Sequence, residues 1–67
     1  MAESDFARRL RRLMAERGMS IRELSSRSAI SQPSVYKYLN GQCVPNVTRL
    51  RRIRATLGCT WDELLGE

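Results

Sequence analysis

Three groups of residues in this sequence could do chemistry: two cysteines, many arginines, and a run of polar side chains between Ser31 and Asn40. The chain has no histidine, so it lacks an imidazole base and a histidine metal ligand. Cys43 and Cys59 are too few sulfurs for a structural zinc site, and we expect both to be reduced residues of a loop or of the core. We therefore expect no enzyme activity, no metal site, no cofactor and no small-molecule substrate.

Basic residues dominate the middle of the chain. The formal net charge is +5, from 12 Lys and Arg against 7 Asp and Glu. All the basic residues lie between Arg8 and Arg54, and the only acidic residues in that span are Glu16 and Glu23. Such a distribution favours a polyanionic partner, whereas solvated arginines on ordinary surface helices are the alternative interpretation.

The length limits the chain to one small domain. Its 67 residues cannot bury two independent cores, and 42% hydrophobic and 28% charged residues are typical of a globular protein. No segment has the ~20 apolar residues that cross a membrane, and the N-terminus lacks the apolar run of a signal peptide. We expect a single domain over residues 1–67, soluble and cytoplasmic, with no membrane partner.

The spacing of apolar residues predicts a series of short helices and no strand. A first helix is predicted from near Ser4 to Gly18, with its arginines on the side opposite an apolar stripe. Ser20 and Glu23 form a capping box that begins a second helix, which ends near Ala29. The residues expected to face the core are Phe6, Leu10, Leu13 and Met14 in the first helix and Ile21, Leu24, Ser25 and Ser28 in the second.

A third helix is predicted from Ser31, an N-cap, to Leu39 or Asn40, with Gly41 ending it. Pro33 suits its first turn because that turn does not need the missing N–H. One side of the helix is apolar and carries Val35, Tyr38 and Leu39. The opposite side is polar and carries Pro33, Lys37 and Asn40 near its centre, Gln32 and Tyr36 on one flank and Ser34 on the other.

Two further helices follow. Asn46 is expected to cap a fourth helix that ends at Gly58, and Thr60 with Glu63 repeats the capping box at the start of a last helical turn. Arg54 falls within the apolar stripe of the fourth helix, and we expect it to reach past the core toward a carboxylate of the last turn or elsewhere. The residues expected to face or seal the core are Val47, Leu50, Ile53, Leu57 and Trp61.

The second and third helices meet at a tight corner, which is the arrangement of a helix-turn-helix. In that motif the first helix lies across a DNA duplex and the second projects side chains into the major groove. The third helix begins with small polar residues and exposes groups that can bond base edges or phosphates. Lys37 can reach guanine acceptors, and Gln32 can pair with adenine.

The stretch from Met19 to Gly58, MSIRELSSRSAISQPSVYKYLNGQCVPNVTRLRRIRATLG, resembles the Cro/repressor helix-turn-helix family, also called XRE or lambda-repressor-like. The order and spacing of the helices, Asn40-Gly41 and the loop with Pro45 carry this resemblance. The segment 60–65 is similar to the family's fifth helix. The resemblance implies an all-α, five-helix bundle with the motif at about residues 20–40, which binds operator DNA and regulates transcription.

The resemblance also implies which residues meet DNA. The base-reading positions of the family fall on the third helix, at Gln32, Pro33 and Lys37, with Ser34 and Tyr36 beside them. The phosphate-contacting positions lie at two helix starts and in the loop after the third helix, at Ser20, Ile21, Ser31, Asn40, Gly41 and Gln42. Backbone N–H groups can make such contacts, so Ile21 needs no polar side chain.

Several residues depart from the family pattern. Ala29 stands where the corner usually has glycine, which carries a cost if that position needs a positive φ. Ser28 stands where an apolar residue is usual, and Leu39 where a glutamate commonly precedes Asn-Gly. Pro33 offers only an apolar contact, such as one to a thymine methyl.

Other residues have competing roles. We expect Tyr38 to be a core aromatic and Tyr36 to point outward as a candidate for nucleic-acid contact. Arg8, Arg9 and Arg12 on the first helix are expected to solubilise the back of the domain. Arg49 and Arg52 on the fourth helix fit either role.

Two classes of function follow. The first is a sequence-specific double-stranded DNA-binding regulator of bacterial or phage type, a nucleoid-associated repressor that occupies a palindromic operator as a weak homodimer through the fourth and fifth helices. The alternative is a protein-interaction module on the same fold, of the antitoxin or anti-repressor type. The polar side of the third helix, with Lys37 and no acidic residue, favours the first class.

Overall fold

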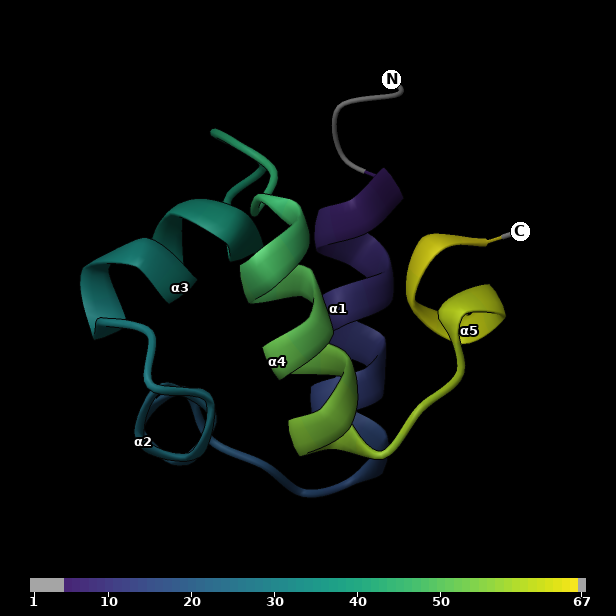
Figure 1. The fold of residues 1–67 in the computed structure, drawn as a ribbon, viewed down its shortest axis with the longest axis horizontal. Helices are drawn as coiled ribbons and strands as arrows, with labels where there is room; N and C mark the ends of the chain where they lie inside the picture. Colours follow the sequence, from purple (N-terminus) through teal and green to yellow (C-terminus); the bar gives the residue numbers. More distant parts are fainter. Residues whose placement is uncertain (1–4, 67) are drawn as a thin grey trace.

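The computed structural model describes residues 5–66, which form five helices and no strand within that range (Figure 1). The helices are α1 (Asp5–Glu16), α2 (Ile21–Ser28), α3 (Gln32–Leu39), α4 (Val47–Leu57) and α5 (Trp61–Leu65). The predicted all-α, five-helix fold is confirmed, and the start near Ser4 predicted for the first helix lies outside the described residues. Among the described helices, none has both the length and the apolar character needed to cross a membrane.

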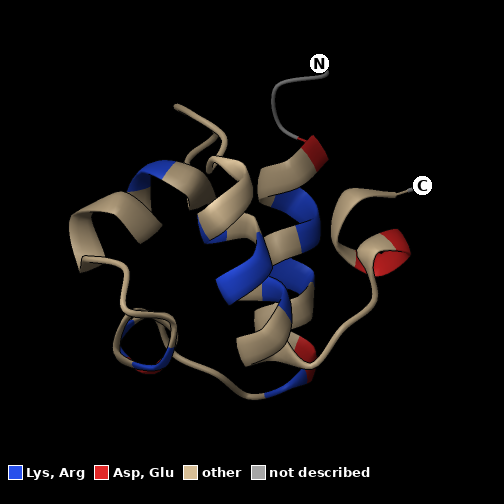
Figure 2. Cartoon of the chain, viewed as in Figure 1, with Lys and Arg blue, Asp and Glu red and all other residues tan. Residues whose placement is uncertain are grey.

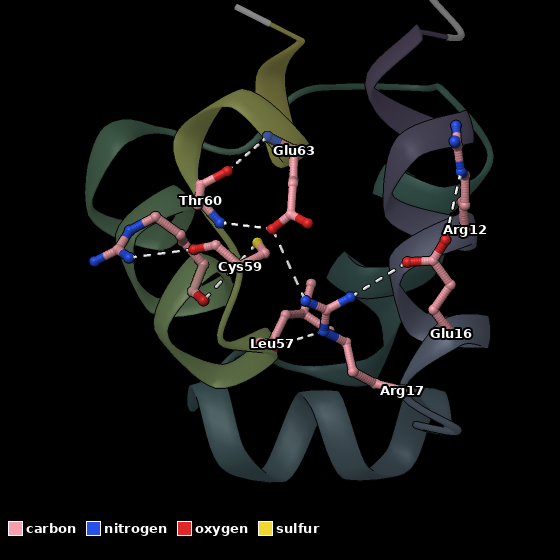
Figure 3. Close-up of polar contacts among 8 residues, drawn as sticks. Arg12, Glu16, Arg17, Leu57, Cys59, Thr60 and Glu63 are labelled. Atoms are coloured by element: carbon pink, nitrogen blue, oxygen red, sulfur yellow. Dashed lines mark hydrogen bonds and ion pairs between the residues drawn. The ribbon is translucent and has the colours of Figure 1, made fainter.

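The helix starts are fixed by side chains that accept backbone N–H groups. Ser20 Oγ accepts from the N–H of Glu23 at 3.1 Å, and Glu23 Oε1 accepts from the N–H of Ser20 at 3.0 Å. Thr60 and Glu63 form the same reciprocal pair, which Figure 3 shows. Each box satisfies two donors that the first helical turn leaves unpaired, so both predicted capping boxes are confirmed.

The corner between α2 and α3 depends on a left-handed residue. Ala29 has φ 59° and ψ 39°, and it is the one non-glycine residue with positive φ in the described part of the chain. Its conformation lets the N–H of Ile30 donate to the carbonyl of Ser25 at 3.2 Å, which closes α2. Ser28 is buried just before this corner, and its hydroxyl donates to the carbonyl of Leu24, so the polar group is satisfied inside the core.

The core lies among all five helices. α1 packs against α3 and α5, and α2 packs against α3 and α4 (Figure 1). The predicted inner residues of α1, and those of α3, are all buried. The buried apolar cluster consists of Phe6, Leu10, Leu13, Met14, Leu24, Ile30, Val35, Tyr38, Leu39, Ile53, Leu57, Cys59 and Leu64.

The prediction that Val47 faces the core is wrong, because its side chain is 63% exposed. An α-helix turns by about 100° per residue, so Val47 lies about 120° around the axis from Ile53. Leu57, by the same count, lies about 40° from Ile53 and is buried. The three-residue spacing from Val47 to Ile53 therefore drifts off the buried face.

The prediction that Trp61 seals the core is also wrong. Leu64 takes the core position of the short helix α5 and is fully buried, whereas Trp61 is 39% exposed and Leu65 is 37% exposed. The prediction that Arg54 reaches a carboxylate is wrong for the described residues. Its guanidinium carbon lies 5.1 Å from the centre of the Trp61 ring, and its Nη1 donates to the carbonyl of Cys59 at 3.3 Å.

Candidate nucleic-acid interface

The outer face of α3 is exposed because the inner face holds the helix in the core. Val35, Tyr38 and Leu39 are buried on the inner side. The five residues predicted to read bases lie on the remaining surface: Gln32, Pro33, Tyr36 and Lys37 are exposed, and Ser34 is half-buried. We call this surface the outer face of α3. Its groups are an amide, a pyrrolidine ring, a phenol, an ammonium and a hydroxyl, all of which suit base edges.

The first turn of α3 is ordered by its own hydroxyl groups. Ser31 Oγ accepts from the N–H of Ser34 at 3.4 Å, and the two side-chain oxygens are 3.0 Å apart in a hydrogen bond. Ser34 is therefore bonded to the cap of its own helix. Gln32 and Lys37 have no hydrogen bond or ion pair from their side chains within residues 5–66, so their polar groups are directed to solvent.

The start of α2 offers two unpaired backbone donors. The N–H groups of Ser20 and Glu23 are both used in the capping box, and that of Leu24 donates to the carbonyl of Ser20. In the described structure the N–H groups of Ile21 and Arg22 have no acceptor. A positive helix end with free N–H groups suits an anion, so at this site the backbone of Ile21 is better placed than that of Ser20.

The loop of residues 40–46, which we call the α3–α4 loop, begins by closing α3. The N–H of Gly41 donates to the carbonyl of Tyr38 at 3.2 Å, and the N–H of Gln42 donates to that of Lys37 at 3.0 Å. Gly41 has φ 76°, a conformation that favours glycine. The backbone donors of these two residues are therefore occupied, and the exposed side chains of Asn40 and Gln42 are the groups that remain available.

Charge is divided unequally between two sides of the molecule. Every ion pair in residues 5–66 involves α1, the residue after it, or α5: Arg8–Asp5, Arg12–Glu16, Arg17–Glu16 and Arg17–Glu63. The basic residues of α2, α3 and α4 have no carboxylate partner in that range. Figure 2 shows red segments at both ends of α1 and on α5, and blue segments on α1, α3 and α4. The α2–α4 side thus keeps its positive charge.

Within residues 5–66 the cysteines and acidic residues are not grouped into a metal-binding site. Both cysteines are free, with Cys43 exposed and Cys59 buried. Burial raises the pKa of the Cys59 thiol above its ordinary value, which favours the inert protonated form. No three His, Cys, Asp or Glu side chains of the described residues are grouped so that they could hold a metal ion.

Three arginines have roles that the sequence analysis missed. Arg11 Nη2 donates to the carbonyl of Leu39 at 2.7 Å, and Arg17 Nε donates to that of Leu57 at 2.6 Å. Arg49 Nη1 donates to the hydroxyl of Tyr38 at 2.8 Å. Two of these bonds place a positive group at the C-terminus of another helix, where free carbonyls favour it. Helical periodicity identifies only the outward direction of such side chains, not the neighbour that they meet.

Comparison with known proteins agrees with this geometry. The search of curated proteins and the search of solved structures gave no significant match. A family model described as a Cro/C1-type HTH DNA-binding domain matches residues 9–66, which includes every residue of the proposed interface. The resemblance seen in the sequence is confirmed, and the chain belongs to the Cro/C1-type helix-turn-helix DNA-binding domains.

Proposed function

We propose that this protein is a sequence-specific transcriptional regulator that acts as a repressor by occupying a palindromic operator. The observation that carries the proposal is the exposed outer face of α3, which is polar and lacks acidic groups, on a helix whose inner face is buried. A helix presented in this way fits the major groove of a duplex. The unpaired basic residues of α2–α4 supply attraction to phosphates.

Within this proposal the outer face of α3 reads the bases. Gln32 pairs with adenine, Lys37 bonds to guanine, and Pro33 packs on a thymine methyl. Ser34 and Tyr36 contact bases beside them. Tyr36 is 52% exposed, so its ring and hydroxyl are accessible to a ligand.

Phosphate contacts flank the reading helix. Ser20 and Ile21 contribute the N-terminus of α2, and Ser31 contributes the start of α3. Asn40, Gly41 and Gln42 meet the backbone from the α3–α4 loop. Since the N–H groups of Gly41 and Gln42 close α3, the hydrogen bonds of this loop to phosphate come from the side chains of Asn40 and Gln42, and Gly41 makes only van der Waals contact. These contacts set the register of α3 on the duplex without reading sequence.

The proposed assembly is a weak homodimer of single domains, each formed by residues 1–67, that acts in the cytoplasm at the nucleoid. One recognition helix reads only a few base pairs, and two of them on half-sites roughly 34 Å apart would supply the missing specificity. Trp61 and Leu65 lie on one side of α5 and are both partly exposed, which supports an interface at that helix.

The test is a titration of a mixed duplex pool at two salt concentrations, followed by selection of bound duplexes from a random library. We expect binding to weaken with salt. The logarithm of the binding constant should fall against the logarithm of the salt concentration with a slope of about −0.9 for each phosphate neutralised. The selection should enrich a two-fold symmetric sequence. A chain that binds no duplex at low salt would contradict the proposal and favour the protein-interaction module.

A further inference from the structure

Arg49 is held in a fixed position beside the α3–α4 loop. Its Nη1 donates to the hydroxyl of Tyr38 at 2.8 Å, and Tyr38 is only 3% exposed, with its ring in the core. Its backbone N–H donates to Asn46 Oδ1, the cap of α4, at 2.9 Å. The residue is therefore restrained at its backbone and at its guanidinium.

The guanidinium of Arg49 keeps most of its donors. It carries five N–H groups, and the bond to Tyr38 uses one of them. Arg49 forms no ion pair with any carboxylate of residues 5–66, and the sequence has no acidic residue between Glu23 and Asp62. A phenol oxygen accepts a hydrogen bond without neutralising the positive charge. Arg49 is thus a half-buried cation with unused donors.

The surroundings of Arg49 suit an anion. The residue lies in the first turn of α4, directly after the α3–α4 loop. In the described structure the N–H groups of Val47 and Thr48 have no acceptor, so free donors stand at the same helix end. A guanidinium and backbone N–H groups together match the oxygens of a phosphate better than either alone.

We propose that Arg49 binds a backbone phosphate of the DNA duplex and that Tyr38 is the residue that positions it. The inference rests on the proposed function and adds a contact from α4 to those predicted on α2, α3 and the loop. Because the bond to Tyr38 restricts the long side chain already in the free protein, less conformational freedom is lost on binding. The hydroxyl of Tyr38 thereby contributes to DNA affinity while buried and away from the duplex.

The experiment measures the affinity of four variants for a mixed-sequence duplex pool across a range of salt concentrations. We expect Arg49→Gln to weaken binding about tenfold for all sequences and to reduce the salt slope by about 0.9. Arg49→Lys and Tyr38→Phe keep the charge, so both should weaken binding less and leave the slope unchanged. Arg12→Gln is the matched control, since it removes an equal charge from an α1 residue paired with Glu16, and we expect neither quantity to change.

Thermal melting of each variant separates folding from binding. A folded Arg49→Gln variant with the wild-type slope would overturn the proposal and leave Arg49 as a link between α3 and α4 only. Wild-type affinity in Tyr38→Phe would remove the positioning role. If Arg49→Gln does not fold, the same measurement on Arg49→Met, which also removes the charge, decides instead, and an unchanged salt slope would overturn the proposal. An unmodified chain that binds no duplex would overturn the proposed function, which is a different result from any of these.

Discussion

Arg17 joins the end of α1 to the end of α4, because its Nε donates to the carbonyl oxygen of Leu57 at 2.6 Å (Figure 3). The same guanidinium lies 3.4 Å from Glu16 Oε1 and 3.9 Å from Glu63 Oε1. One side chain thus connects the C-termini of two helices with the capping box of α5. The side chain is 28% exposed, so this network is partly shielded from water.

Arg17→Met should therefore lower the free energy of unfolding by about 1.5–3 kcal/mol, the range for a hydrogen bond to a charged group. Urea denaturation followed by circular dichroism measures the change. Arg12→Met is the control, because the Arg12–Glu16 pair is exposed and worth about 0.5 kcal/mol or less. Equal losses in the two variants would contradict the role given to the Leu57 carbonyl.

Ala29→Gly should stabilise the protein. A left-handed conformation costs a residue with a Cβ about 1–2 kcal/mol, and the added flexibility of glycine in the unfolded chain offsets part of the gain. We expect a net increase of about 0.5–1 kcal/mol in the free energy of unfolding. Ala55→Gly is the control, because Ala55 is an exposed residue of the right-handed helix α4. This variant should lower the free energy of unfolding by about 1 kcal/mol. A loss in both variants would show that the corner is not strained.

Gln32→Ala and Lys37→Ala test whether the outer face of α3 reads bases. Gln32→Ala should relax preference at one or two base pairs of a selected operator, by about 1–3 kcal/mol. Lys37→Ala should do the same at a guanine, or weaken binding to all sequences if its ammonium meets phosphate. Binding profiles of both variants over a random duplex library measure the difference. A profile unchanged in both would remove α3 from the reading role.

Leu65→Glu should abolish self-association while leaving the domain folded. Leu65 is 37% exposed and lies beside Trp61, so a carboxylate there would be buried without a partner in an interface formed by α5. Sedimentation velocity without DNA measures the assembly. Val44→Glu introduces the same charge at a 60% exposed loop residue and should sediment as the unmodified chain does. An unmodified chain that is monomeric with and without operator would contradict the dimer.

The two thiols should react at different rates. Native protein treated with iodoacetamide at pH 8 should be alkylated at Cys43 and protected at Cys59, with both modified in denaturant. Burial raises the pKa of Cys59, so the folded state retains its proton at a pH where the unfolded thiol loses it. The contribution of Cys59 to the free energy of unfolding should therefore be full below about pH 8.5 and fall as the pH rises above that value. Equal alkylation of both thiols in native protein would contradict the burial of Cys59.

Local signals explain how much of the fold could be predicted. The N-caps at Ser20, Ser31, Asn46 and Thr60 lie one residue before the observed helices, because each cap acts on the backbone of its own first turn. The outer face of α3 could also be predicted from local spacing, since burial of Val35 and its neighbours determines which residues of the helix remain exposed.

The contacts between helices could not be predicted from such signals. Arg54 was expected to find a carboxylate but lies on the Trp61 ring, because the orientation of α5 relative to α4 decides its partner. The bond from Arg49 to Tyr38 joins residues 11 apart in sequence and depends on the path of the α3–α4 loop. The exposure of Val47 was open to prediction, because a turn of about 100° per residue places it away from the face of Ile53 and Leu57. The shortness of the last helix likewise indicated that its apolar residues could not all be buried.

The unequal division of charge affects how the free protein is oriented when it approaches a charged partner. The ion pairs of residues 5–66 lie around α1 and α5, whereas the cations of α2–α4 have no carboxylate partner there, so positive charge is concentrated toward α2–α4. Under the proposed function, the field of a duplex would attract this positive side and turn α3 toward the DNA during diffusion. Productive first collisions should then be more frequent than chance orientation allows, and added salt should remove that kinetic advantage along with the binding strength.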